Sequence, residues 1–409
     1  MIIHRPEEVG RINNVRKWTL VFGRRKTGKT FLVENFVKYD EYFFVNRDRT
    51  VISKREGTQV GYDVFIDRLR RGIADGKTVA VDEFQRLGGP FLDLLHSIGS
   101  GGKVILLSST LFLARRLISA GSPILGLFNE VQVPIISLED SMQALAGFGL
   151  SKKELVEAAI MLREPMAAEY FDREGRIRAT MADILLGSVN SIPALFGEIL
   201  IEEDRGTSAI YEGVIRAVAD GKVTSGEISS SLFSKRLISK DNPGFVQPYL
   251  NIMMQIGILK RVRVYSKNRF VYKCVSPLMR LFFYADEKYG VSQRQIGRAE
   301  AERILDEMLP RILEDNIREY LAYKLGLEEN VVHSADYEID GVLTRFKKPS
   351  VALEVKWKRK VTAAELREAE EKLGRIEAGR RVLFVQDKAG LTSRKLEIID
   401  AYDLLGASP

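Results

Sequence analysis

The chain has 409 residues, too many for one ordinary hydrophobic core, so we expect two to four domains. Hydrophobic residues make up 45% and charged residues 29%, proportions that are typical of a globular protein and argue against a disordered one. The single cysteine, Cys274, excludes an internal disulfide. No apolar run reaches the roughly eighteen residues of a membrane span, and the amino terminus lacks a signal-peptide pattern. These features predict a cytoplasmic protein without membrane contact.

Positive charge is concentrated in one segment. The net charge is +7, but the segment from Lys222 to Arg280 holds eleven Lys and Arg against two acids, a local +9. A local excess of this kind is typical of a module that binds a polyanion.

The strongest motif is a glycine loop between a strand and a helix. Trp18 to Phe22 is an apolar, β-prone run, and a helical pattern follows Thr30. The glycines allow backbone N–H groups to face a phosphate at the helix amino terminus, while Lys29 reaches the β- and γ-phosphates and the Thr30 hydroxyl binds Mg²⁺. A glycine loop without nucleotide is the alternative, which the matching flanks disfavour. The predicted nucleotide-binding residues are Gly23, Arg24, Arg25, Lys26, Thr27, Gly28, Lys29, Thr30 and Asp82.

Two further strands end in residues suited to nucleotide hydrolysis. The run from Lys77 to Val81 leads into Asp82 and Glu83. Asp82 is predicted to hold Mg²⁺, and Glu83 to orient and deprotonate the attacking water. A third run, "KVILLSST", places Ser109 where it could contact the γ-phosphate or the water, although a turn-forming serine is the alternative.

Three segments together carry a family resemblance. The runs "VFGRRKTGKTFLV", "VAVDEFQRL" and "VILLSST" are similar to those of the archaeal AAA+-type ATPases that carry an accessory carboxyl-terminal domain. The resemblance implies an α/β fold, a P-loop NTPase with a parallel sheet core and a helical lid. It also implies ATP as the nucleotide and a sensor role for Ser109.

The sequence departs from that family at two places. Leu127 follows Gly126 where the family has Gly-Arg, which leaves Arg115 or Arg116 to sense the γ-phosphate. The family's Gly-Gly-x-Pro of the lid appears here only as residues 162–165, "LREP", so slow turnover is one expectation.

The middle of the chain predicts a lid and a winged helix. Residues 137–205 have helical periodicity, with Ser137 and Ser151 as helix starts, and form either a lid or a plain helical linker. Residues 206–290 predict three helices and a β-hairpin, the winged-helix order, which binds double-stranded DNA or, alternatively, docks a protein. The predicted DNA-binding residues are Lys260, Arg261, Arg263, Lys267 and Arg269.

Residues 291–409 predict the order helix, strand, strand, helix, strand, which is the core of the PD-(D/E)XK nuclease-like fold. Asp340 and Glu354 would bind a nuclease Mg²⁺, Lys356 would stabilise the attacked phosphate, and Glu314 matches an optional fourth carboxylate. The accessory domain of the archaeal family has the same "EID…EVKW" pattern. Whether this tail cuts DNA or only grips it stays open.

Taken together, these patterns predict an ATPase core in residues 1–136 that controls a DNA-binding wing and a nuclease-like tail. The alternative is a nucleotide-gated switch with slow turnover that docks proteins. The sequence leaves the oligomeric state and the choice between ATP and GTP open.

Overall fold

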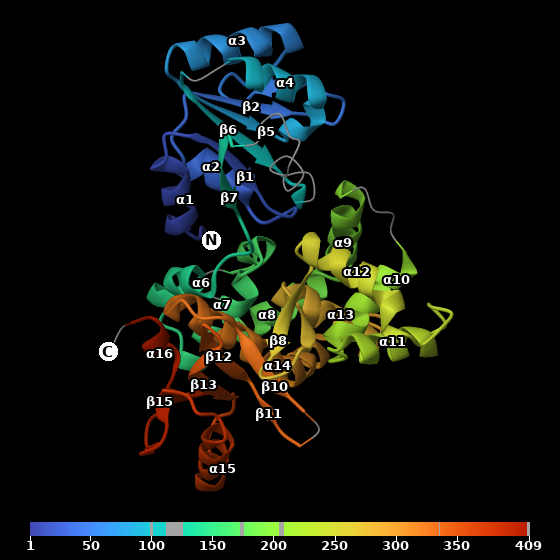
Figure 1. Ribbon diagram of the computed structural model, residues 1–409, viewed down its shortest axis with the longest axis vertical. Coiled ribbons are helices and arrows are strands. Elements are labelled where there is room, and N and C mark those ends of the chain that lie inside the picture. The colour runs from blue at the N-terminus through green and yellow to red at the C-terminus, as the bar shows by residue number, and fades with distance from the viewer. Residues whose placement is uncertain (99–100, 112–125, 172–175, 204–207, 335, 407–409) are drawn as a thin grey trace.

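A computed structural model describes residues 1–98, 101–111, 126–171, 176–203, 208–334 and 336–406. Its amino-terminal part is a seven-stranded sheet with the order β4-β3-β2-β5-β6-β1-β7, at the top of Figure 1. The strands from β2 to β7 in that order pair in parallel, and β3 and β4 add an antiparallel edge. The strands are β1 (Trp18–Phe22), β2 (Glu41–Val45), β3 (Val51–Ser53), β4 (Thr58–Val60), β5 (Thr78–Asp82), β6 (Lys103–Ser108) and β7 (Phe128–Gln132).

Helices cover both faces of this sheet, so its central strands are apolar on both sides. One face packs against α3 and α4 through residues such as Phe65 and Phe91. The other packs against α1 and α2 through Ile12 and Leu32. This arrangement confirms the predicted α/β sheet core. The helices are α1 (Pro6–Asn13), α2 (Lys29–Phe36), α3 (Tyr62–Ala74) and α4 (Gly89–Ile98).

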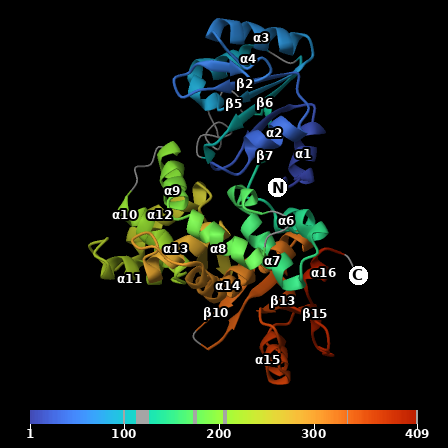
Figure 2. The same ribbon diagram turned by 180° about the vertical axis from the view of Figure 1, so that it is seen from behind.

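A helical region follows β7 and lies directly below the sheet in Figures 1 and 2. Ser137 and Ser151 start helices as predicted, because their hydroxyls accept hydrogen bonds from the backbone N–H of Asp140 and Glu154. The helices are α6 (Leu138–Leu145), α7 (Lys152–Leu162), α8 (Ile177–Gly187) and α9 (Ser191–Glu202), with a 3₁₀ turn at Pro165–Glu169.

Three helices and a β-hairpin come next, in the predicted order. They are α10 (Ala209–Ala219), α11 (Ser225–Ser234), α12 (Pro243–Gln255), β8 (Leu259–Val264) and β9 (Phe270–Cys274). The chain then continues through α13 (Pro277–Tyr289) and the long helix α14 (Arg298–Leu325).

The remaining elements are β10 (Asn330–His333), β11 (Glu338–Ile339), β12 (Gly341–Arg345), β13 (Lys348–Lys356), α15 (Ala363–Gly374), β14 (Arg380–Val385), β15 (Glu397–Ile399) and α16 (Ala401–Leu404). The order helix, strand, strand, helix, strand is present in α14, β12, β13, α15 and β14, and β12 to β15 form one four-stranded sheet. Strands β10 and β11 are additional.

The hairpin and the tail share a sheet, which the predicted boundary at residue 290 does not anticipate. Strand β10 pairs in parallel with β8, giving the order β11-β10-β8-β9. One hydrophobic core also runs from Ile136 to Leu404 through the lid, the hairpin region and the tail. The described parts of residues 137–205, 206–290 and 291–409 therefore share one core, although the tail sheet packs a second apolar cluster against α15.

Within the described ranges, no single helix is long and apolar enough to cross a membrane. The pair α8 and α9, bent by 55°, meets the test of length and composition only when the two helices are taken together.

Candidate functional site

The glycine loop lies between β1 and α2, at the carboxyl edge of the parallel sheet. A Cβ atom at Gly23 would lie 2.2 Å from the carbonyl oxygen of Val133, so only glycine fits under the chain that leaves β7. Gly28 has φ +86°, in the left-handed region, and precedes the first residue of α2. Because a glycine has no side chain to cap the helix, the first N–H groups of α2 are available to an anion.

Lys29 folds back over this loop. Its ammonium group donates hydrogen bonds to the carbonyl oxygens of Gly23 and Arg24, at 2.8 and 2.9 Å. Burial lowers the pKa of Lys29 to about 8, although the carboxylates Glu83 and Asp82 act in the opposite direction. Lys29 is therefore a buried cation held by neutral carbonyls, ready to pair with a phosphate.

Asp82 is fully buried at the end of β5. Its Oδ2 accepts hydrogen bonds from the Thr30 hydroxyl at 2.6 Å and from the Tyr42 hydroxyl at 2.9 Å, and its Oδ1 accepts one from the Glu83 N–H. Burial, and then the charge of Asp82, raises the pKa of Tyr42. The Thr30 and Asp82 oxygens are hard ligands that fit a Mg²⁺ ion. Sequence patterns gave no signal for Tyr42, which comes from the neighbouring strand β2.

Glu83 has φ +55°, a left-handed conformation that is uncommon for a residue with a side chain. Its Oε2 accepts hydrogen bonds from Gln85 at 2.7 Å and Ser109 at 3.1 Å, and pairs with Arg86 at 3.1 Å. Burial raises the pKa of Glu83, and Arg86 opposes that shift. Ser109 thus lies beside Glu83, where it can orient the carboxylate. The importance of Arg86 is visible only in the structure, although it stands three residues after Glu83.

These groups line a cavity of about 660 Å³. Lys29, Thr30, Glu83 and Ser109 form its polar end, and the chain start at Met1–Ile3 contributes an apolar wall. Other lining residues come from the start of α1, the loop, α2 and the region after β7, and include Arg5, Arg25, Lys26, Thr27, Gly28, Phe31, Phe36, Ile136, Pro165, Met166 and Ala168. The volume lies within the range of roughly 300–1,000 Å³ that is usual for cofactor and ligand pockets.

The arginines of the loop point away from this polar end. Arg24 forms a buried ion pair with Glu164, and Arg25 pairs with Glu198 at 2.6 Å and with Glu202. In this structure both side chains join the loop to the region that follows β7, and their part in nucleotide binding stays a prediction.

Residues 15–138 match the model of the AAA domain family. The matched segment is less than a third of the chain. It contains the glycine loop, Asp82, Glu83 and Ser109, so the segment that is similar to the AAA domain family carries the whole polar end of the cavity. The candidate arginines 115 and 116 lie outside the described residues.

No curated protein sequence matches the chain. Among solved structures, an Aeropyrum pernix ORC2 protein in ADPNP-ADP complexes matches at 11% identity and TM-score 0.37, over 76% of this chain and 91% of that one. The Aeropyrum pernix ORC1 protein in complex with DNA matches at 14% identity and TM-score 0.29, over 76% and 95%. Cdc6p from Pyrobaculum aerophilum matches at 14% identity and TM-score 0.27, over 74% and 92%. At such low TM-scores, the assignment depends on the AAA domain match alone.

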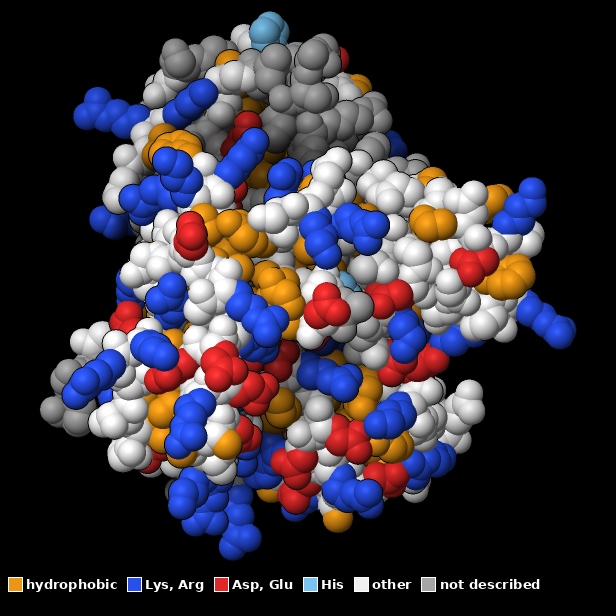
Figure 3. Space-filling model, turned by 60° about the horizontal axis from the view of Figure 1, so that its bottom comes forward, with side chains coloured by type: hydrophobic (Ala, Val, Ile, Leu, Met, Phe, Trp, Pro, Cys, Tyr) orange, Lys and Arg blue, Asp and Glu red, His pale blue; other side chains and the backbone are white. Residues whose placement is uncertain are grey.

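The charge excess around the hairpin is partly neutralised by the tail. Lys260, one of the predicted DNA contacts, pairs with Glu319 at 2.5 Å and Glu329 at 2.9 Å, so its ammonium group is already neutralised within the chain. Lys273 and Arg280 both pair with Asp315. Figure 3 shows one face of the molecule, on which basic and acidic side chains are interspersed rather than sorted into one patch.

Four predicted DNA contacts differ from Lys260, because they are exposed on the hairpin and no ion pair is found for them among the described residues. They are Arg261, Arg263, Lys267 and Arg269. The guanidinium groups of Arg261 and Arg263 lie 4.7 and 5.6 Å from the centre of the Phe270 ring, which fixes both on the outer face.

The tail brings Asp340, Glu354 and Lys356 together, and lysine side chains pair with Glu354. The Val355 N–H donates to Asp340 at 2.8 Å, and Glu354 Oε1 pairs with Lys356 at 3.1 Å and with Lys372 of α15 at 2.6 Å. Burial, and then the charge of Glu354, raises the pKa of Asp340.

Glu314 is close enough to Asp340 that burial, and then that neighbouring charge, raises its own pKa. Within the described residues, no group of three or more His, Cys, Asp or Glu is arranged to hold a metal. Lys356 and Lys372 both engage Oε1 of Glu354, while its buried Oε2 has no hydrogen-bond partner among the described residues, so a metal at Asp340 and Glu354 stays a prediction.

Proposed function

We propose that the AAA domain binds ATP with Mg²⁺ in the cavity at the glycine loop and hydrolyses it. The observation that carries this proposal is the convergence of Lys29, Thr30 and Glu83 at the polar end of one cavity, with the Asp82 carboxylate hydrogen-bonded to the Thr30 hydroxyl. Phosphates in the loop would take over Lys29 from the carbonyls of Gly23 and Arg24. When bound, Mg²⁺ would neutralise charge on the phosphates, and Thr30 and Asp82 would hold it.

Titration of the full chain with ATP and MgCl₂, followed by calorimetry, tests this proposal. We expect saturable binding of one nucleotide and release of inorganic phosphate on longer incubation. Absence of detectable affinity for ATP and for GTP would contradict the proposal.

The contacts of the Glu83 carboxylate favour slow hydrolysis. Three side chains, those of Gln85, Arg86 and Ser109, already engage the Glu83 carboxylate. A base held in this way has to be released or reoriented before it can accept a proton from water. A nucleotide-gated switch with slow turnover is therefore the second candidate, and turnover measured with and without DNA separates the two.

We further propose that the exposed face of the hairpin binds double-stranded DNA. Arg261, Arg263 and Arg269 extend from it, supported by the contacts of two of them with Phe270. DNA cleavage is not part of the proposal, because Lys356 and Lys372 engage Glu354.

Replacing Arg261, Arg263 and Arg269 together with Ala is expected to weaken binding to a duplex at least tenfold at low salt. The slope of log affinity against log salt should fall by about 0.9 per lost phosphate contact. Fluorescence anisotropy with a labelled duplex over a salt series measures both quantities. The matched control replaces Arg345, Lys347 and Lys348, three exposed basic residues of the β12–β13 hairpin, and should bind like the wild type. Equal affinity of the two triple variants would refute the DNA-binding face.

A further inference from the structure

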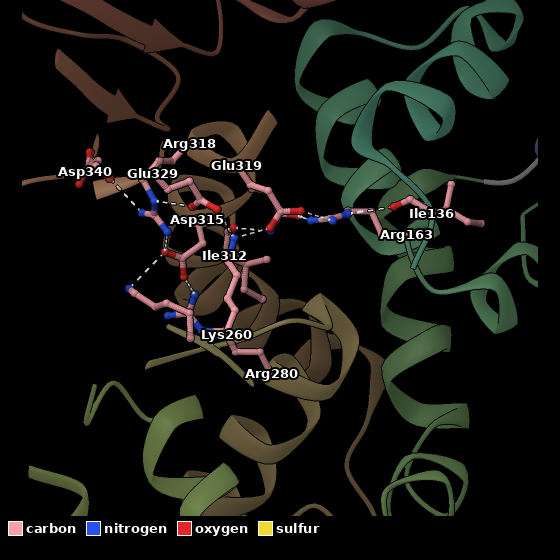
Figure 4. Close-up of polar contacts among 12 residues, drawn as sticks. Ile136, Arg163, Lys260, Arg280, Ile312, Asp315, Arg318, Glu319, Glu329 and Asp340 are labelled. Carbon is pink, nitrogen blue, oxygen red and sulfur yellow. Dashed lines mark hydrogen bonds and ion pairs between the residues drawn. The ribbon is translucent and has the colours of Figure 1, made fainter. Parts of the chain in front are cut away.

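A series of polar contacts, which we call the relay, connects the glycine loop with the hairpin and the tail. It begins at Arg24, whose guanidinium pairs with Glu164 of the lid. The adjacent residue, Arg163, points the other way and donates to Asn316 and, at 2.5 Å, to Glu319 of α14. Figure 4 shows Arg163 and Ile136 on the lid side and Glu319 facing them from α14.

From Glu319 the relay continues through both later regions. Lys260 of β8 lies between Glu319 and Glu329. Glu329 accepts from Arg318 at 3.1 Å, and Arg318 donates to the backbone carbonyl of Asp340 at 2.9 Å (Figure 4). Asp340 lies just before β12, so the relay ends at the segment that presents the tail carboxylates.

Most members of the relay are buried. Arg24, Arg163 and Arg318 are 4%, 5% and 1% exposed, and Glu164 is fully buried. Burial opposes the shift, but the cations Arg163 and Lys260 lower the pKa of Glu319 to about 2. A buried charged side chain that loses its partner destabilises the protein strongly. Breaking one ion pair of the relay therefore favours a new pairing at the next ion pair.

The loop end of the relay lies at the nucleotide cavity. Pro165, directly after Glu164, lines the cavity and would lie 3.8 Å from a Cβ atom at Gly28. Ile136 also lines the cavity, and its carbonyl accepts a hydrogen bond from Arg163 at 3.1 Å. Negatively charged phosphates in the loop would compete with Glu164 for Arg24, and the segment that carries Arg163 would respond.

We propose that Arg163 and Glu164 transmit the nucleotide state of the glycine loop to the β8–β9 hairpin and to the Asp340 segment. This inference rests on the proposed nucleotide binding and adds its regulation. Arg163 stands at the second glycine of the resembling family's Gly-Gly-x-Pro, and Glu164 at its variable position. Binding at the loop shifts Arg163 relative to α14, and Lys260 and Arg318 then adjust their pairing. By linkage, ligands of the hairpin change nucleotide affinity by the same factor.

Hydrogen–deuterium exchange of the full chain, with and without ATP and MgCl₂, tests the relay. In the wild type we expect slower exchange at residues 23–30 and a change of exchange at residues 259–264 and 338–345. In Arg163→Ala the change at the loop should persist while the two remote changes are lost. Glu319→Gln should give the same result and serves if Arg163→Ala does not fold.

The matched control is Arg178→Ala. Arg178 of α8 also joins the lid to α14, through Asp306, and pairs with Glu157 at 3.2 Å, but it lies outside the relay. This variant should keep the loop change and both remote changes. Remote changes that persist undiminished in both Arg163→Ala and Glu319→Gln, or that are absent from the wild type, would overturn the relay. Absence of any change at residues 23–30 in the wild type would instead overturn nucleotide binding itself.

Discussion

Glu83→Gln is expected to lower the rate of ATP hydrolysis by roughly 10²- to 10⁴-fold, the usual contribution of a general base. The amide keeps the shape of the side chain and can still accept hydrogen bonds from Gln85 and Ser109. It cannot accept a proton from water. Nucleotide binding should be unchanged, because Lys29 and the loop amides remain in place.

Phosphate release under single-turnover conditions measures this effect, with ATP affinity as the internal control. Single-turnover conditions remove product release from the measured rate. A variant that binds ATP and hydrolyses it at the wild-type rate would exclude Glu83 as the base. If the wild type itself is slow, the three contacts to the Glu83 carboxylate explain why, and Arg86 becomes the residue to vary next.

Lys29→Ala is expected to weaken ATP binding by roughly 10- to 150-fold, because a hydrogen bond to a charged group contributes about 1.5–3 kcal/mol and each 1.4 kcal/mol is a factor of ten. In the free protein the ammonium group already sits at the loop, on the carbonyls of Gly23 and Arg24. Little reorganisation is therefore needed when a phosphate replaces those carbonyls. Calorimetric titration with ATP and MgCl₂ gives the affinity.

Lys38→Ala is the matched control for Lys29→Ala. Lys38 is an exposed lysine just after the same helix, so its loss changes the net charge equally without touching the cavity. Its ATP affinity should equal that of the wild type. If Lys29→Ala also binds ATP as tightly as the wild type, the phosphates do not lie where the loop geometry places them.

The glycine loop and its neighbouring strands could be predicted from the sequence, because their signals are local. Gly23 to Thr30 is one continuous run, and Asp82 and Glu83 end one apolar strand. Each element can therefore be predicted from the composition and spacing of its own residues. The folded sheet adds Tyr42, which comes from a strand that carries no motif of its own.

The charges of the hairpin could not be interpreted from its own segment, because acidic residues far along the chain pair with one of them. Lys260 is 59 and 69 residues away from its partners Glu319 and Glu329. Counting charges within one segment treated Lys260 as free, whereas the long helix α14 and the loop after it neutralise it. Arg261 and Arg263 stay exposed because they alternate with the buried Val262 and Val264 on the strand.

In the tail, too, the local sequence pattern did not reveal a partner from another element. The pattern correctly brought Asp340 next to the strand that carries Glu354 and Lys356. It did not foresee Lys372, which approaches Glu354 from α15 and changes what the carboxylate can bind. Similarly, the departure "LREP" predicted slow turnover, but it did not foresee the contacts that Arg163 and Glu164 make in two directions.

The shared sheet of β8, β9 and β10 has a consequence for how the chain assembles on the ribosome. Strand β8 ends at Val264, but its outer neighbour β10 begins only at Asn330. Until the later segment emerges, one side of β8 presents unpaired N–H and C=O groups, an edge that invites pairing with other chains. The seven-stranded sheet, in contrast, is complete once Gln132 has been made. During synthesis the seven-stranded sheet can therefore form early, whereas the sheet of β8, β9 and β10 can form only after residue 333 has been made.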